Sequence, residues 1–249
     1  FLPFTGFFAN FLNKAITDSR GKEKLYLTHL DFSKYDTGFA AIEQSKFEVE
    51  RMAGHTIEMF SNLKIALTRD ERSEEVTKLI FERENILDTV QKEITGFLTD
   101  VRTEVLSHDL VEESNSHLHL ADEYESVSDY ITQVLKLDIR LKESDLRLSK
   151  EQIEEINGLH DTLAVILSRI INLEKREKQN AIHQSVTAES ATIKEVIRRH
   201  RTNHWARIAN VEMNPLLMTT YTDMLVSYRK ILDHLINISE AKLPREVNS

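Results

Sequence analysis

The sequence lacks cysteine altogether and has only six glycines and three prolines among its 249 residues. The absence of cysteine excludes disulfides, thiolate catalysis, iron–sulfur clusters and cysteine-based zinc sites. So few glycines and prolines leave little material for tight turns, which disfavours all-β folds and α/β folds with many strands. The composition therefore favours long helices with few connections.

Positive charge is also in deficit, since the formal net charge is −9. This balance argues against nucleic acid as the main partner, because a phosphate backbone is bound by clustered cations. The sequence contains no Gly-rich phosphate loop, no Gly-x-Ser-x-Gly elbow and no His-Glu-x-x-His motif. None of the ten histidines follows a glutamate by three residues. Catalysis therefore has little support, and we expect no enzymatic activity.

Aromatic residues gather at the start of the chain, where five of the eleven phenylalanines fall within residues 1–11. The apolar run over 1–16 is shorter than the ~20 residues that span a bilayer and lacks the features of a signal peptide. Two alternatives remain, an interfacial segment at a membrane exit and an arm packed on helices. Because the chain starts at Phe1, we expect a fragment or a processed product.

Beyond a polar linker at 17–37, apolar residues recur every three or four positions. In one such stripe Leu159, Leu163 and Ile166 share a helix face, and each stripe must be buried against other helices. The pattern predicts helices over 38–68, 72–107, 109–146, 150–180, 188–212 and 214–242. Ser73, Asp109 and Asn214-Pro215 are the predicted helix starts.

An internal repeat relates two of these helices, because residues 124–134 match 228–238 at an offset of 104. Chance alignment of two amphipathic helices is the alternative, but the matched Asp129 and Asp233 lie off the apolar stripe. We predict an all-α fold with an aromatic arm and linker at 1–37, three-helix units at 38–146 and 150–242, and a tail at 243–249.

Acidic residues dominate the third stretch, which has seven between Asp109 and Asp129 and no lysine or arginine. Glu125 and Asp129 are four apart and therefore share a helix face. Glu84 and Asp88 repeat this spacing on the second stretch. If the two helices are adjacent, four carboxylates converge and a hard or borderline cation would relieve their repulsion. The alternative is a solvated acidic face, which is common on surface helices.

Basic residues cluster in the fifth stretch and form a candidate patch for an anion, a membrane headgroup or an acidic partner. Its members are Arg198, Arg199, Arg201 and Arg207. The alternative is a solvated face that pairs with the acidic third helix or with the third helix of a symmetry mate. His117 and His119 lie two apart and face different ways, so we expect ordinary surface or flanking residues rather than metal ligands.

The paired motifs resemble the third helices of the PhoU family, which carry Glu-Arg-Ile-Gly-Asp-like signatures. The first copy has Glu125-Ser126-Val127-Ser128-Asp129. The second copy ends in Asp-His-x-x-Asn-Ile-x-Glu, from Asp233 to Glu240. Glu48-x-x-Arg51-Met52-Ala53 on the first helix is also similar to the family. The start, Leu2-Pro3-Phe4-Thr5, resembles the exit of the last membrane helix in bacterial sodium/phosphate cotransporter-related proteins, which carry a PhoU-like domain.

The resemblance implies two tandem PhoU-like three-helix bundles with a metal cluster in the first. Its ligands would be Glu84, Asp88, Glu125 and Asp129, and zinc, iron, manganese or nickel its metal. The second copy departs, because Arg229 replaces the motif glutamate and Arg199 and Asn203 stand where carboxylates are expected. Any metal is therefore expected in the first copy only.

The resemblance further implies a non-catalytic regulatory domain of a sodium-dependent phosphate transporter. Its expected partner is the attached transmembrane domain, on the cytoplasmic side of the bacterial inner membrane, with residues 1–16 near the membrane surface. A homodimer is also plausible. The alternatives are a free-standing PhoU-like regulator of phosphate uptake and a metal-dependent helical-bundle enzyme.

Overall fold

A computed structural model describes residues 38–69, 71–101, 106–172, 176–208 and 214–243, with the backbone alone for 176–178. These residues form six α-helices and no strand, which confirms the all-α prediction. The helices are α2 (Gly38–Thr68), α3 (Glu74–Val101), α4 (His108–Glu143), α5 (Lys150–Ile171), α6 (Arg176–Ile208) and α7 (Pro215–Ala241). The predicted arm and linker at 1–37, the membrane contact at 1–16 and the tail beyond Leu243 lie outside the described residues.

The apolar stripes of the sequence are the buried faces of the helices. On α4, Tyr124, Val127 and Ile131 have no exposed surface, and on α5 Leu163 and Ile166 have none. Buried apolar residues from all six helices form one continuous core. Burial of these stripes is therefore what holds the helices together.

One predicted boundary is wrong. The helices were expected over 150–180 and 188–212, but α5 ends at Ile171 and α6 begins at Arg176. Ile170 is the last buried residue of α5, and the backbone N–H of Asn172 closes the helix on Ser168. In α6, Val186 is already fully buried. The segment assigned to a connection thus belongs to the buried stripe of α6.

Side-chain caps explain the starts of α5 and α7. The Asn214 side chain accepts a 2.9 Å hydrogen bond from the first turn of α7, as predicted. The prediction for α4 is wrong, because Ser107 is its N-cap and Asp109 lies inside the first turn. Ser149 and Gln152 form a reciprocal capping box on α5, with bonds of 2.9 and 3.2 Å. The Ser-x-x-Gln spacing was a visible signal for it.

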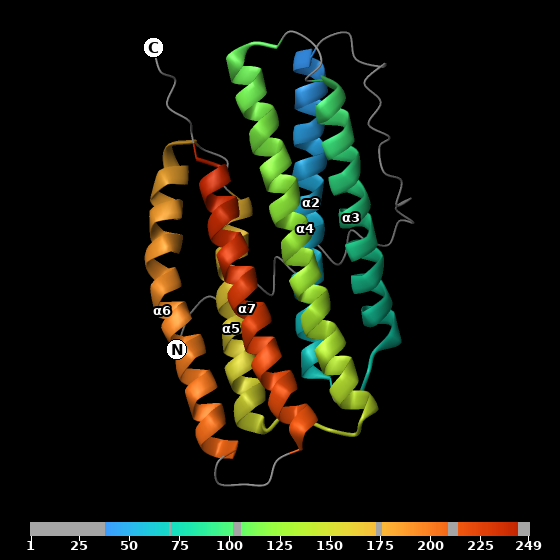
Figure 1. The fold of residues 1–249 in the computed structure, drawn as a ribbon, viewed down its shortest axis with the longest axis vertical. Helices are drawn as coiled ribbons and strands as arrows, with labels where there is room; N and C mark the ends of the chain where they lie inside the picture. The colour runs from blue at the N-terminus through green and yellow to red at the C-terminus, as the bar shows by residue number, and fades with distance from the viewer. Residues whose placement is uncertain (1–37, 70, 102–105, 173–175, 209–213, 244–249) are drawn as a thin grey trace.

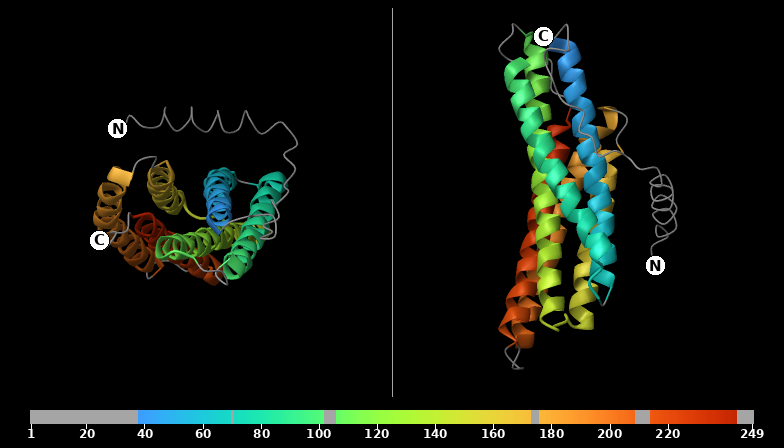
Figure 2. Two further views of the ribbon diagram at one scale, coloured as in Figure 1. Left: turned by 90° about the horizontal axis from the view of Figure 1, so that it is seen from above. Right: turned by 90° about the vertical axis from the view of Figure 1, so that its right-hand side faces the viewer.

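The helices divide into two units of three, α2–α4 (unit one) and α5–α7 (unit two). Figure 1 shows α4 and α7 toward the viewer, α2 and α5 behind them, and α3 and α6 at the flanks. The view from above in Figure 2 shows the same two-layered arrangement. The contact between α4 and α7 is the most extensive between any two helices, so the units are fused along their third helices.

Further contacts cross between the units at α2 and α5. The Phe60 and His160 rings lie 4.5 Å apart, and Lys64 pairs with Asp161 at 2.8 Å. Among the described helices, none combines the length and the apolar character needed to cross a membrane.

Candidate functional site

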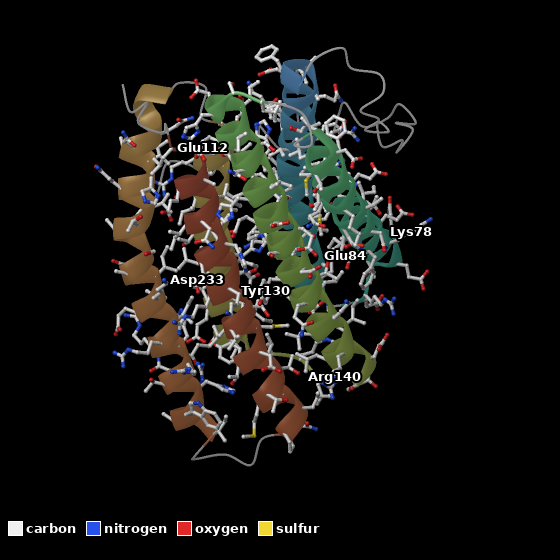
Figure 3. The ribbon with its side chains drawn as sticks, turned by 45° about the horizontal axis from the view of Figure 1, so that its top comes forward. Lys78, Glu84, Glu112, Tyr130, Arg140 and Asp233 are labelled. Atoms are coloured by element: carbon white, nitrogen blue, oxygen red, sulfur yellow. The ribbon has the colours of Figure 1, made fainter. Side chains whose placement is uncertain are left out.

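Four acidic residues predicted from the sequence lie together between α3 and α4, and we call them the acid quartet. They are Glu84, Asp88, Glu125 and Asp129. The charge of Asp88 acts on each of the other three, and Asp122 adds a fifth carboxylate beside Glu125. Figure 3 labels Glu84 where α3 approaches α4. The adjacency of the two helices therefore gathers the pairs that the spacing identified.

This crowding shifts the ionisation of the quartet. Burial is the largest cause of the raised pKa of Glu84, Glu125 and Asp129, and the charges of neighbouring carboxylates raise these pKa values further. Lys136 opposes the shift at Glu84 and Asp129. A raised carboxyl pKa means that the fold disfavours the ionised form. At neutral pH the cluster therefore holds negative charge that a cation would relieve.

Neighbouring side chains already stabilise part of the negative charge of the acid quartet. The Lys92 ammonium lies 2.7 Å from Asp88, and Gln91 donates a 2.6 Å hydrogen bond to Asp122. Within the described ranges, no three histidine, aspartate or glutamate side chains are arranged to hold a metal ion. The oxygen donors suit a hard or borderline cation. For several of these carboxylates to ligate one ion, Lys92 must move away from Asp88. Metal binding by the acid quartet therefore stays a prediction.

The four arginines of the predicted basic patch do not lie together. Arg198 and Arg201 line a hollow between α6 and α7, whereas Arg199 and Arg207 do not. Arg207 instead pairs with Glu151 and Glu155 of α5, both at 2.9 Å. Within the chain, the described ion pairs of α6 reach only α5, α7 or α6 itself, so pairing with the third helix of the same chain is not found. Pairing with the third helix of a second copy stays a prediction.

Unit two has a place that corresponds to the acid quartet. The positions of the buried residues on α6 match those on α3 when 110 is added to the residue number. Val76, Ile80, Leu87 and Ile94 correspond to Val186, Ser190, Ile197 and His204, all buried. The same spacing puts Lys194 and Arg198 in place of the two acids of α3. The expectation that Arg199 and Asn203 hold these positions is wrong, because the buried stripe through Ile197 sets a different register.

The joint between the units contains a buried acid that the sequence reasoning missed. Glu123 of α4 is 8% exposed and accepts hydrogen bonds from His234 at 2.8 Å and Asn237 at 3.1 Å, both on α7. Burial alone would raise the pKa of Glu123, but these bonds outweigh it and hold the pKa below 4.5. The His-x-x-Asn spacing placed both donors on one face, but nothing in the sequence indicated their acceptor.

A serine–histidine pair inside unit one has the composition of a nucleophile and a base. The Ser45 hydroxyl and His117 Nδ1 lie 2.8 Å apart, and both residues are buried. The Ser45 hydroxyl also lies within hydrogen-bond distance of the carbonyl of Ile42, at 2.7 Å. Because both residues are buried, we interpret this pair as a structural contact.

The first unit matches a known family. Residues 49–137 match the family model of the PhoU domain, and they span most of α2, all of α3 and most of α4. The fold is similar to the crystal structure of the phosphate transport system regulatory protein PhoU from Streptococcus pneumoniae. The TM-score is 0.68 at 15% identity, and the likeness covers 83% of this chain and 95% of that chain. No curated protein matches this sequence.

At that identity the structural likeness shows the fold alone. It extends beyond unit one and so covers most of both three-helix units. The resemblance to PhoU derived from the sequence is therefore confirmed, as a PhoU domain match in unit one and a PhoU fold over most of the described chain.

Proposed function

We propose that this chain regulates phosphate transport and does no chemistry itself. The observation that carries the proposal is the PhoU fold of both units together with the PhoU domain match over 49–137. The similar structure is named as a phosphate transport system regulatory protein. The two helical units share one continuous apolar core, so they are packed together as one structure.

The proposed regulator acts as the cytoplasmic domain of a sodium-dependent phosphate transporter in the bacterial inner membrane. The support is the resemblance of the Phe-rich segment at 1–16 to the exit of a transporter's last membrane helix. The first test is the reading frame upstream of Phe1. Hydrophobic helices there support the attached form, and an initiating methionine directly before Phe1 favours the free-standing regulator.

Uptake of radiolabelled phosphate tests the regulatory role in either form. Cells with the full-length gene are compared with cells whose gene lacks residues 38–243, at low and at high external phosphate. We expect the deletion to abolish the fall in uptake at high phosphate. Equal responses in the two strains would contradict a regulatory role.

The absence of chemistry is tested separately by incubating the purified chain with a panel of phosphate esters. We expect no turnover, because both members of the Ser45–His117 pair are buried. Turnover that co-purifies with the chain through several columns would contradict a non-catalytic role.

We also propose that the acid quartet binds a divalent metal and that Lys92 competes with it. Metal-stripped protein is titrated calorimetrically with manganese, iron, zinc and nickel, and its thermal stability is followed in parallel. Saturation to 100 times the dissociation constant stabilises a fold by about 2.7 kcal/mol. We expect the variant E125Q/D129N to lose this stabilisation by metal. The variant Lys92→Gln should bind the metal more tightly than the parent.

The matched control is Asp109→Asn, which removes an exposed acid from the first turn of the same helix. In EDTA, the E125Q/D129N variant should be more stable than the parent by about 0.2–0.5 kcal/mol, since like charges four apart repel. If the metal-stripped protein binds none of the four metals in the titration, the metal proposal is wrong.

A further inference from the structure

The counterpart of the acid quartet in unit two has the opposite charge. On α6, Lys194 and Arg198 replace the acids of α3, and on α7 Arg229 replaces the glutamate of the motif. Only Asp233 remains, and Lys194 neutralises it at 2.8 Å. The same place in the repeated architecture therefore carries acids in one unit and cations in the other.

This place in unit two is a hollow of about 440 Å³ between α6 and α7, which we call the basic groove. Figure 3 labels Asp233 where α6 and α7 lie side by side. Five cations line it: Lys194, Arg198, Arg201, Arg229 and Lys230. The only carboxylates among the lining residues are Glu195 and Asp233. The groove therefore holds three positive charges in excess, in a chain whose net charge is −9.

The excess is carried by side chains that have no ion-pair partner among the residues that the structure describes. Arg198 is held by Glu195 at 2.5 Å, as Lys194 is by Asp233. Arg201, Arg229 and Lys230 are exposed, and none forms an ion pair with a described carboxylate. Three cationic side chains from two helices thus line one groove without forming an ion pair with a described carboxylate.

The groove also has an apolar floor. Ile197 and Leu225 are buried beneath it, and Val226 is 46% exposed. The volume is in the range of small-molecule sites, which are concave and partly apolar with a few placed charges.

Chemistry narrows the class of ligand. Guanidinium groups form paired hydrogen bonds with phosphate oxygens, and lysine adds a point charge. Three unmet cations spread along two helices suit an anion with several charges in a row. A single orthophosphate would engage only part of the groove.

We propose that the basic groove binds an oligophosphate chain, inorganic or carried by a nucleotide. This deepens the proposed function, on which its physiological meaning rests. Binding itself is measured on the isolated protein, so failure of the regulatory role and failure of this site are distinguishable.

The test is calorimetric titration of the full chain with tripolyphosphate, ATP and orthophosphate at physiological salt. We expect tripolyphosphate to bind at least tenfold more tightly than orthophosphate, with affinity that falls as salt rises. If ATP and tripolyphosphate bind equally tightly, the groove recognises the phosphates alone. If ATP binds more tightly, the apolar floor also contacts the nucleoside. Tripolyphosphate should also shift the amide resonances of α6 and α7 rather than those of α3.

The test variants are Arg201→Gln and Arg229→Gln, each expected to weaken tripolyphosphate binding about tenfold. Arg199→Gln is the matched control, because Arg199 is an exposed arginine on the same helix that does not line the groove. All three substitutions are at exposed positions, and circular dichroism verifies that the fold is kept.

Three results would overturn the proposal. One is no binding of tripolyphosphate at millimolar concentration, and another is an equal loss in all three variants. The third is a dimer of the parent that Arg229→Gln dissociates while tripolyphosphate binds neither form. That result would assign the basic groove to the acidic face of a second copy.

Discussion

At the scale of single residues, the joint between the units depends on one buried carboxylate. Glu123 accepts hydrogen bonds from two side chains of α7, and His234 is further fixed by stacking on Tyr130, with ring centroids 5.6 Å apart. A charged acceptor with two donors contributes more than a neutral one. Loss of its charge should therefore weaken the contact between α4 and α7.

We predict that Glu123→Gln lowers the free energy of unfolding at neutral pH by about 1–3 kcal/mol. A carboxyl whose pKa is lowered in the fold stabilises it above its ordinary pKa of 4.5, and that contribution disappears as pH falls through the lowered value. Urea denaturation at several pH values measures this. The gap between parent and variant should narrow below pH 4.5, and a gap that stays constant to pH 2 would contradict the assignment.

His117 also makes the fold less stable as pH falls, but because burial disfavours its charged form rather than because partners hold a charge. Burial, aided by the charge of Lys46, lowers its pKa from 6.5 to about 4, so the folded state keeps the ring neutral. The unfolded chain therefore binds a proton at higher pH than the fold, and stability is lost as pH falls from 6.5 toward 4.

We predict that His117→Gln flattens this part of the stability profile. The parent should lose on the order of 2–3 kcal/mol between pH 6.5 and 4 through this group, and the variant should not. Parallel slopes for parent and variant in that window would show that His117 is not the titrating group.

At the scale of helices, the ends are set by particular side chains rather than by the apolar stripes alone. Ser149 satisfies an N–H group at the start of α5 that has no partner within the helix. Ser107 occupies the same position on α4, but its side chain makes no capping hydrogen bond. The two serines therefore form a matched pair.

We predict that Ser149→Ala lowers the free energy of unfolding by about 1 kcal/mol, because it removes the capping box. Ser107→Ala should change it by much less. Chemical denaturation of the two variants alongside the parent measures the difference, and equal losses would contradict a role for the box.

The helices themselves could be predicted because their apolar stripes recur with helical spacing, as at Leu163 and Ile166. The acid quartet followed from the same logic, since it needs only spacing and adjacency. The division between α5 and α6 could not be predicted, because no glycine or proline marks it. The acceptor for His234 and the register of Lys194 depend on how helices far apart in sequence pack, which spacing within one helix does not specify.

At the scale of the whole molecule, the two units share one core rather than two. Apolar residues of α2 and α4 pack in the same continuous cluster as those of α5 and α7. Phe60 of unit one is 2% exposed, and its ring lies against His160 of unit two. The fused core predicts that neither unit unfolds without the other.

We predict a single cooperative unfolding transition, even though the chain is longer than most two-state domains. Phe60→Ala should lower the free energy of unfolding by about 3–5 kcal/mol, because it empties a large buried volume. Native-state hydrogen exchange should then show faster opening in α7 as well as in α2. The exposed Phe47→Ala on the same helix is the matched control and should have little effect. Separate transitions for the two units, or faster exchange confined to unit one, would show that the repeats are energetically independent and that a signal received by one does not reach the other through the core.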